Sequence, residues 1–388
     1  MRWVESEFDR LANPAIAASV LRQAVDKQPD NAALQERLGN ALVACQLASE
    51  ALRPYETALR LAPDKFKMWP MLALLYSESG RQEAAIDLCG RGESQGLVAN
   101  TKFVQACALR RLHRLDEARA AVQAALQSGQ IHFAALRIYL GLLAREPDGA
   151  ELLDVCDALP QSHQYRALAR AHRAIALSRI GRTEEALRLV DLDRHVIRVP
   201  FVPPAQFGGI DRFNRRLADD ILADRSPIKP EGFDINYAPI YRLSEAFVAL
   251  RAFIKGAMEN YLNEFGTLGL DTIMPLPEEG ALWTGSLVLR EDYHNGEHIH
   301  AEACVVAVYH VLLPDSVTQA SDERGALALG CCETYTGGYK PCWGTRYIKP
   351  VAGSLVIFPA HVFHDVVPSQ TDAPRISVPA NLNPTAAV

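Results

Sequence analysis

A period of about 34 residues in the first half most strongly constrains what this chain can fold into. Pro29 and Pro63 lie 34 residues apart, and each follows an apolar helical stretch. Small and large apolar residues recur in phase around them: Leu38, Gly39, Leu42, Ala51, Tyr55, Ala58, Trp69, Leu72, Ala73, Tyr76, Ala85, Ala106, Leu109 and Ala118. One such unit cannot bury its apolar face alone, so the period predicts stacked pairs of helices.

The order of these residues resembles the tetratricopeptide repeat pattern, in which small residues let the two helices of a unit cross closely. The resemblance implies an α-α superhelix of four or five units over about residues 14–195, two of them degenerate. We therefore expect residues 1–195 to form a tetratricopeptide-like helical repeat domain. A peptide-binding groove, a plain scaffold and a dimerisation surface, which would make a homodimer, all remain open as its role.

Charge and hydropathy exclude several classes of protein. The formal net charge of the 388 residues is −6, which argues against a general nucleic-acid binder because that would need a basic face. The N-terminus has charged residues throughout, so we do not expect a signal peptide there. The most apolar stretch, "ACVVAVYHVLL", is shorter than the roughly 20 residues that span a bilayer, so we expect no transmembrane helix. The eight cysteines form no CxxC pair. Because the sequence shows no export signal, we expect these cysteines to be free thiols in a cytoplasmic protein. We expect no membrane partner.

The second half of the chain has a different pattern. Two helices are expected at residues 211–224 and 243–266, the latter ending at Gly266. From about residue 280, short β-like runs alternate with glycine and proline, including "LWTGSLVLR", "GSLVIFP" and "RISVPANL". Several short strands with such turns predict a sandwich or a jelly-roll barrel over residues 196–388. The whole chain is then a multidomain α + β protein.

Histidines concentrate in this second half, where six of the eleven fall between residues 294 and 364. His298 and His300 are two residues apart, so on an extended segment both side chains point the same way. His364 follows a buried strand, and Arg375 and Ser377 alternate with apolar residues further on. Histidines and a carboxylate on one face with open positions are typical of non-haem Fe(II) oxygenases. A buried arginine nearby suits a dicarboxylate such as 2-oxoglutarate.

The span from "LWTGSLVLREDYHNGEHIHAEACVVAVYHVLLP" to "LVIFPAHVFHDVVPSQTDAPRISV" resembles a bacterial family of 2-oxoglutarate/Fe(II)-dependent oxygenases that often follows tetratricopeptide repeats. The shared features are a tryptophan strand, an HxH, an apolar strand with tyrosine, a "GALALG" piece, "VIFP" before the distal histidine, and an arginine eleven residues later. The resemblance implies a double-stranded β-helix, a jelly-roll or cupin-like form, with flanking helices. It also implies Fe(II), 2-oxoglutarate as co-substrate, O2, and hydroxylation of an unactivated C–H bond.

The resemblance assigns His298, His300 and His364 as metal ligands. Arg375 and Ser377, with the hydroxyl of Tyr309, are predicted to bind the co-substrate. No catalytic residue is expected beyond the metal centre. We expect the substrate to be a peptide or protein side chain that the helical repeats recruit.

One alternative metal ligand and two alternative functions stay open. Glu302 could replace His298 as a ligand, because residues 298, 300 and 302 alternate onto one face of a strand. Val306, Ala307 and His310 also depart from the family, where serine, glycine and a second tyrosine are usual. These departures leave room for a non-catalytic interaction protein with a degenerate barrel. A three-histidine cupin-type dioxygenase that does not use 2-oxoglutarate is the other alternative function.

Overall fold

The computed structural model describes residues 2–4, 14–45, 47–94, 96, 100–160, 163–223, 233–236, 244–270, 277–291, 294 and 296–384. By its internal contacts the chain divides into two compact units. We call Ala12–Glu146 the repeat unit, and Met1–Leu11 with Pro147–Val388 the barrel unit. The helices between residues 150 and 195 group with the barrel in this division. The domain boundary at residues 195/196 stays a prediction about where the repeats end.

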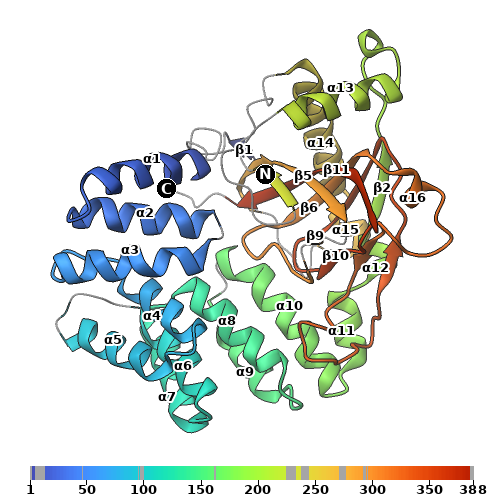
Figure 1. Cartoon of the computed structure of the whole chain (residues 1–388). Helices are drawn as coiled ribbons and strands as arrows, with labels where there is room; N and C mark the ends of the chain where they lie inside the picture. Colours follow the sequence, from blue (N-terminus) through green and yellow to red (C-terminus); the bar gives the residue numbers. More distant parts are fainter. Residues whose placement is uncertain are drawn as a thin grey trace. The chain divides into compact units, whose positions relative to one another are not determined.

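The repeat unit consists of helices in sequence-adjacent pairs (Figure 1). They are α1 (Pro14–Lys27), α2 (Ala32–Ala44), α3 (Ala48–Leu61), α4 (Trp69–Glu78), α5 (Gln82–Ser94), α6 (Lys102–Arg111), α7 (Leu115–Ser128) and α8 (Phe133–Ala144). Each helix from α1 to α6 packs against the next one, and α6 also contacts α8. The predicted stacking of helical pairs is confirmed.

Close packing between α2 and α3 explains the small residues of the repeat. A Cβ atom added to Gly39 would lie 2.4 Å from the Tyr55 ring, so only glycine allows this approach. Tyr55 is fully buried, and its hydroxyl donates a hydrogen bond of 2.7 Å to Asn40 Oδ1. Ala85, Ala118 and Ala125 are likewise completely buried where later helices meet. The period of the sequence is therefore a packing period.

The barrel unit begins with helices and continues into strands. Its helices are α9 (Ala150–Ala158), α10 (His163–Arg179), α11 (Thr183–Leu189), α12 (Leu192–His195), η2 (Ala205–Phe207), α13 (Ile210–Ala223), α14 (Glu245–Asn263), α15 (Phe265–Leu268) and α16 (Asp315–Thr318). Its strands are β1 (Arg2–Val4), β2 (Ile197–Pro200), β3 (Phe233–Asn236), β4 (Glu279–Thr284), β5 (Ser286–Glu291), β6 (Val305–Leu312), β7 (Leu327–Leu329), β8 (Arg346–Ile348), β9 (Ser354–Pro359), β10 (His364–Val366) and β11 (Thr371–Pro384).

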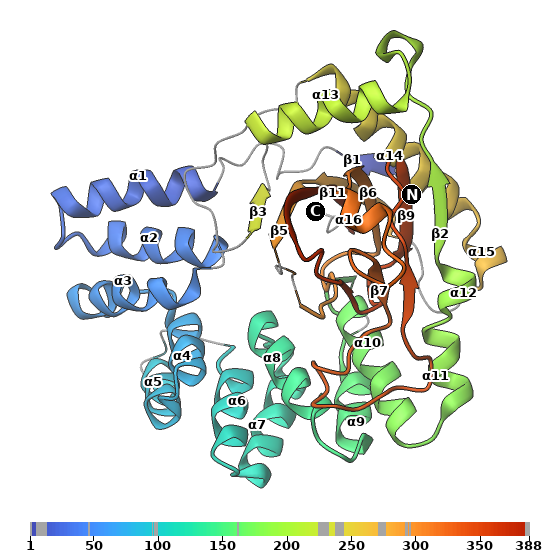
Figure 2. The same ribbon diagram turned by 45° about the vertical axis from the view of Figure 1, so that its right-hand side comes forward.

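The strands form two sheets, as expected for a double-stranded β-helix (Figure 2). The larger sheet has the order β1-β4-β11-β6-β9-β2, and β5 pairs with both β11 and β3. The smaller sheet has the order β10-β7-β8. A single antiparallel bridge between His298 and His364 extends the smaller sheet. The predicted fold class, a helical superhelix followed by a jelly-roll domain with flanking helices, is confirmed.

The central strands of the larger sheet are buried on both faces. On one face, Val378 lies opposite Tyr309, and both belong to an apolar core with residues of α13 and α14. On the other face, Ser377 lies opposite His310. Directly opposed residues of an antiparallel pair point to the same side. We call the side of Ser377 and His310 the inner face and the side that packs on α13 and α14 the helix-facing side.

Several predicted elements end at other residues. The helix expected at 243–266 ends at Asn263, and the short α15 follows it. Gly269, with φ of 74°, then closes α15, because a left-handed backbone suits glycine. The run "LWTGSLVLR" forms two strands, β4 and β5, rather than one. All eight cysteines lie in the described residues and are free thiols. Within the same residues no helix has the length and apolarity to cross a membrane.

Candidate metal centre and co-substrate site

Three histidines from two distant segments meet in the barrel unit. His298 and His364 face each other across the bridge, with reciprocal backbone N–H to carbonyl hydrogen bonds of 3.1 and 2.9 Å. The backbone N–H of His300 donates to the Ala360 carbonyl at 3.1 Å. One potential ligand atom from each of the three imidazoles lies within 4.8 Å of the other two. With metal–nitrogen bonds of about 2.0–2.1 Å, small side-chain movements would bring all three onto one ion.

Hydrogen bonds orient two of these rings. His298 Nδ1 lies 2.7 Å from the Gly296 carbonyl, and His364 Nδ1 lies 3.1 Å from the Val362 carbonyl. A carbonyl only accepts, so each Nδ1 carries the proton and each Nε2 keeps its lone pair. Such a partner on the second ring nitrogen is the usual support of a metal-bound histidine.

The three imidazoles are neutral at physiological pH. Burial, and then the neighbouring His298, lower the pKa of His300 to about 3, although an interaction with Asn381 opposes the shift. Burial is also the main cause that lowers the pKa of His298 and holds that of His364 well below its ordinary value. A neutral imidazole is the form that binds a metal, so no proton has to be removed first.

Glu302, the alternative ligand, lies apart from this cluster. The chain leaves its extended course after His300, whose carbonyl accepts from the Ala303 N–H at 3.0 Å in a turn. Glu302 is exposed on that turn. The alternation that would place residues 298, 300 and 302 on one face therefore ends before residue 302.

Arg375 lies on the inner face and is completely buried. None of its three guanidinium nitrogens has a hydrogen-bond partner among the described residues. Burial lowers its pKa to about 10, so it remains charged at neutral pH. A buried cation without a partner costs several kcal/mol, so an arginine in this state indicates the place of an anionic ligand.

His310, a departure from the family pattern in the sequence, is also on the inner face. It is fully buried opposite Ser377, and neither ring nitrogen has a partner among the described residues. Burial, and then the positive charge of Arg375, hold its pKa well below the ordinary value. No alternation along β6 indicates that His310 faces inward, because that strand is buried on both faces.

Tyr309 lies on the helix-facing side and not with Arg375 and Ser377. Its hydroxyl donates to Asn214 Oδ1 of α13 at 2.7 Å, and its ring packs edge-on against Phe201 at 5.8 Å. This placement departs from the prediction that its hydroxyl reaches the co-substrate. The physical reason is that β6 is buried on both faces, so hydrophobicity alone did not reveal which parity points inward. Ala307 shares the parity of Tyr309 and therefore also lies away from the inner face.

The histidines and Arg375 open to the same side of the large sheet. The strand register shows which residues share the inner face. Ser377 of β11 lies opposite His310 of β6. Asn381 of β11 lies opposite Val306 of β6, which lies opposite Phe358 of β9. Asn381 interacts with His300, and the Phe358 ring lies 4.9 Å from that of His364. Residues of the inner face therefore include Arg375 and also contact two of the three clustered histidines. This combination suits a metal ion and a carboxylate-bearing ligand.

Two other histidines near the cluster have different partners. His294 is exposed, and its Nδ1 lies 2.6 Å from Asp365 Oδ2, next to His364 in sequence. His361 is buried, and its Nε2 lies 2.8 Å from the Leu189 carbonyl at the end of α11. Neither belongs to the group of three that could hold one ion.

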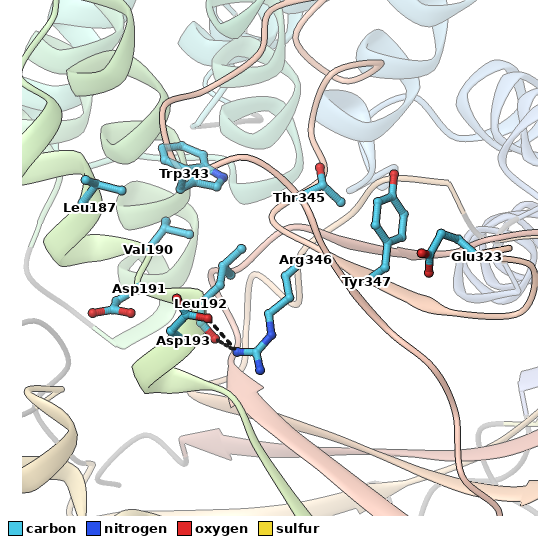
Figure 3. Close-up of a pocket in the computed structure, with 10 residues that line it drawn as sticks. All are labelled: Leu187, Val190, Asp191, Leu192, Asp193, Glu323, Trp343, Thr345, Arg346 and Tyr347. Atoms are coloured by element: carbon cyan, nitrogen blue, oxygen red, sulfur yellow. Dashed lines mark hydrogen bonds and ion pairs between the residues drawn. The ribbon is translucent and has the colours of Figure 1, made fainter. Parts of the chain in front are cut away.

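A separate hollow of about 630 Å³ lies between α11–α12 and the segment around β8 (Figure 3). Its lining includes Trp343 and Tyr347, and Arg346 points toward Asp193 at 3.3 Å. None of the three clustered histidines lines it. The inner face of the barrel, and not this hollow, is therefore the candidate site for metal chemistry.

Residues 281–381 match the family model described as "Putative 2OG-Fe(II) oxygenase". The match spans about a quarter of the chain and includes the three histidines, Arg375, Ser377 and Tyr309. The predicted recognition of a 2-oxoglutarate/Fe(II)-dependent oxygenase domain is confirmed for this segment. The family implies Fe(II) and 2-oxoglutarate, and the neutral imidazoles with the unpartnered guanidinium fit both.

Solved structures give weaker similarities, and a search of curated proteins gives no match. A Pseudomonas putida prolyl-4-hydroxylase is 19% identical with a TM-score of 0.35, covering 50% of this chain and 96% of that one. A Trichoplax adhaerens prolyl hydroxylase in complex with a hypoxia inducible factor peptide fragment is 12% identical with a TM-score of 0.34, covering 53% and 90%. The tetratricopeptide protein YrrB is 20% identical with a TM-score of 0.30, covering 45% and 91%.

Proposed function

We propose that this chain is an Fe(II)- and 2-oxoglutarate-dependent oxygenase that hydroxylates a C–H bond of a peptide or protein. The observation that carries the proposal is the unpartnered, fully buried guanidinium of Arg375 on the inner face, the face whose residues Asn381 and Phe358 contact two of the clustered histidines. A catalytically inert barrel has no reason to keep a buried charge without a counter-ion, because an apolar residue would be more stable there.

In this proposal His298 and His364 hold the metal through Nε2, because their Nδ1 atoms carry the protons. His300 holds it through one of its two ring nitrogens. The guanidinium of Arg375 binds the distal carboxylate of 2-oxoglutarate, and His310 and Ser377 add hydrogen bonds from the opposed strand positions. When bound, Fe(II) with 2-oxoglutarate and O2 supplies the oxidising power for C–H hydroxylation. Phe358 and the buried Leu287 and Leu289 line the strands around this face and exclude water.

The substrate class rests on the repeat unit. Stacked helical pairs present extended surfaces that suit peptide segments. We therefore place the substrate among peptides or proteins in the cytoplasm, with the repeats as the recruiting element. The three-histidine dioxygenase without 2-oxoglutarate is less well supported, because it leaves the guanidinium of Arg375 without a purpose.

Succinate formation by full-length protein with Fe(II), ascorbate, 2-oxoglutarate and a peptide library tests the proposal. We expect succinate release together with the gain of one oxygen atom by a peptide in mass spectrometry. Failure of 2-oxoglutarate to bind the Fe(II)-loaded protein would overturn the proposal. Oxygen consumption without added 2-oxoglutarate would instead favour the cupin-type alternative.

A further inference from the structure

The loop of residues 330–345 between β7 and β8 is bound to α10, a helix that the repeat pattern counts with the first half. His172 Nε2 lies 2.8 Å from the Tyr335 hydroxyl, and Ser178 Oγ lies 2.8 Å from the Tyr339 hydroxyl. Ser178 Oγ also accepts from the Cys342 N–H at 2.9 Å. Arg179 donates to the Thr336 carbonyl at 3.1 Å, and its guanidinium lies 4.1 Å from the centre of the Tyr339 ring. Three residues of α10 thus hold four residues of the loop.

The hydrogen bond between His172 and Tyr335 has a defined direction. His172 is 1% exposed, and its Nδ1 lies 2.8 Å from the Leu168 carbonyl. That carbonyl only accepts, so Nδ1 carries the proton, Nε2 is the acceptor, and the Tyr335 hydroxyl donates. Burial lowers the pKa of His172 to about 4, so the ring stays neutral and keeps this role.

Tyr335 connects α10 with both segments that supply the histidine cluster. Its backbone N–H donates to Glu297 Oε2 at 2.7 Å, and Glu297 directly precedes His298. Its ring lies 4.7 Å from that of Phe363, which directly precedes His364. The ring of His172 also meets Phe363 edge-on, at 6.2 Å. A movement of Tyr335 would therefore displace the neighbours of two clustered histidines together.

A second connection runs from α11. His361 donates from Nε2 to the Leu189 carbonyl at 2.8 Å. On either side of it, the Ala360 carbonyl accepts from the backbone N–H of His300, and the Val362 carbonyl accepts from His364 Nδ1. His361 thus anchors to α11 a tripeptide that binds the backbone of His300 and the imidazole of His364.

We propose that α10 and α11 are part of the framework of the metal centre, with His172 and Tyr335, and separately His361, acting as positioning residues for its ligands. This inference rests on the proposed function, because it assumes that His298, His300 and His364 bind a metal. Its consequence is that these helices belong to the oxygenase, whatever repeat-like pattern their sequence has.

Co(II) titration of full-length apo-protein tests the inference, with the affinity and the visible absorption spectrum as readouts. Tyr335→Phe removes one hydroxyl and keeps the ring against Phe363. Tyr55→Phe in the repeat unit and Tyr309→Phe on the helix-facing side remove hydroxyls with equally short bonds, both 2.7 Å. We expect about 10-fold weaker Co(II) binding and an altered spectrum for Tyr335→Phe, and wild-type values for both controls.

A rescue pair separates positioning from general destabilisation. His172→Gln keeps an acceptor for the Tyr335 hydroxyl and should retain most of the Co(II) affinity, whereas His172→Leu should lose it as Tyr335→Phe does. Wild-type Co(II) affinity and spectrum in both Tyr335→Phe and His172→Leu would overturn the inference, as would equal losses in the two control variants. If wild-type protein binds no metal, the proposed function itself fails. If it binds metal and turns over while the variants match it, only this inference fails.

Discussion

The contact between α2 and α3 in the repeat unit and the inner face of the barrel unit differ in the partners of their buried polar side chains. In the repeat unit, the buried Tyr55 hydroxyl has its partner in Asn40, and the helices meet through glycine and alanine. On the inner face of the barrel, Arg375 and His310 are buried without partners among the described residues. Nine of the eleven histidines lie in the barrel unit, and only His113 and His132 lie in the repeat unit. The α2–α3 contact thus satisfies its buried hydroxyl internally, whereas the inner face leaves two buried side chains available to a ligand.

Removal of an imidazole from the proposed metal site should have the largest effect on metal binding, and the same change in the repeat unit should have none. We expect His364→Ala to abolish stoichiometric metal binding and turnover, because two imidazoles remain where three converge. Bound iron and succinate formation are the measurements.

His132→Ala is the matched control in the repeat unit. His132 accepts from the Ala135 N–H at the start of α8, so its loss should cost about 1 kcal/mol of stability and leave metal binding unchanged. Stoichiometric iron in His364→Ala, or its loss in His132→Ala, would contradict the assignment.

Arg375→Met should separate function from stability. We expect the KM for 2-oxoglutarate to rise about 10- to 100-fold, which corresponds to the 1.5–3 kcal/mol of a charge-assisted hydrogen bond. The apo-protein should unfold at a higher temperature, because a buried charge without a partner is removed.

Arg173→Met is the control, since Arg173 forms a partly exposed ion pair with Asp157. Its expected effect on stability and on KM is small. A lower unfolding temperature for apo Arg375→Met would show that its guanidinium has a structural partner after all.

Acid should destabilise the barrel unit more than the repeat unit. Burial lowers the pKa of His172 to about 4 and that of His361 to about 3, against about 6.5 in an unfolded chain. Below pH 6.5 the unfolded state takes up protons that the folded state does not, so stability falls as the pH approaches these lowered values. Each such histidine should cost roughly 3 kcal/mol between pH 7 and pH 4.

Hydrogen exchange of the metal-free protein, resolved by peptide segment, measures the difference in acid sensitivity between the two units. Peptides of the barrel unit should lose protection at higher pH than those of α1–α8, and His172→Gln should reduce the effect. Equal acid sensitivity of the two units would contradict the prediction.

The smallest effect expected is in repeat packing. Gly39→Ala should destabilise the repeat unit by about 1–3 kcal/mol, because the added methyl would overlap the Tyr55 ring. Gly90→Ala, where nothing lies within 4 Å, should stabilise α5 by about 0.5–1 kcal/mol. Thermal unfolding and Co(II) titration check both variants, and neither should change metal affinity. A stable Gly39→Ala would show that α2 and α3 can separate without cost.

Local patterns in the sequence predicted the candidate site in part. The spacing of His298 and His300, the distal His364 and the alternation of Arg375 with Ile376 all anticipated groups that the fold brings together. The sequence does not assign Tyr309 and His310 to opposite faces, because β6 is apolar on both faces and alternation has no contrast there. Glu302 was kept as an alternative ligand because a turn at residues 301–302 is not evident from an HxHxE string.

The sequence by itself determined features that are local in the chain: the helical period, the β-like runs and the residue types that suit iron and a carboxylate. Only the tertiary structure decided which side of β6 faces Arg375 and which helices contact the segments of the three clustered histidines. The reason is sequence distance. His172 and Tyr335 are 163 residues apart, and His361 and Leu189 are 172 apart, so no local pattern contains either pair. Such contacts exist only after the sheet closes and α10 and α11 pack against its loops.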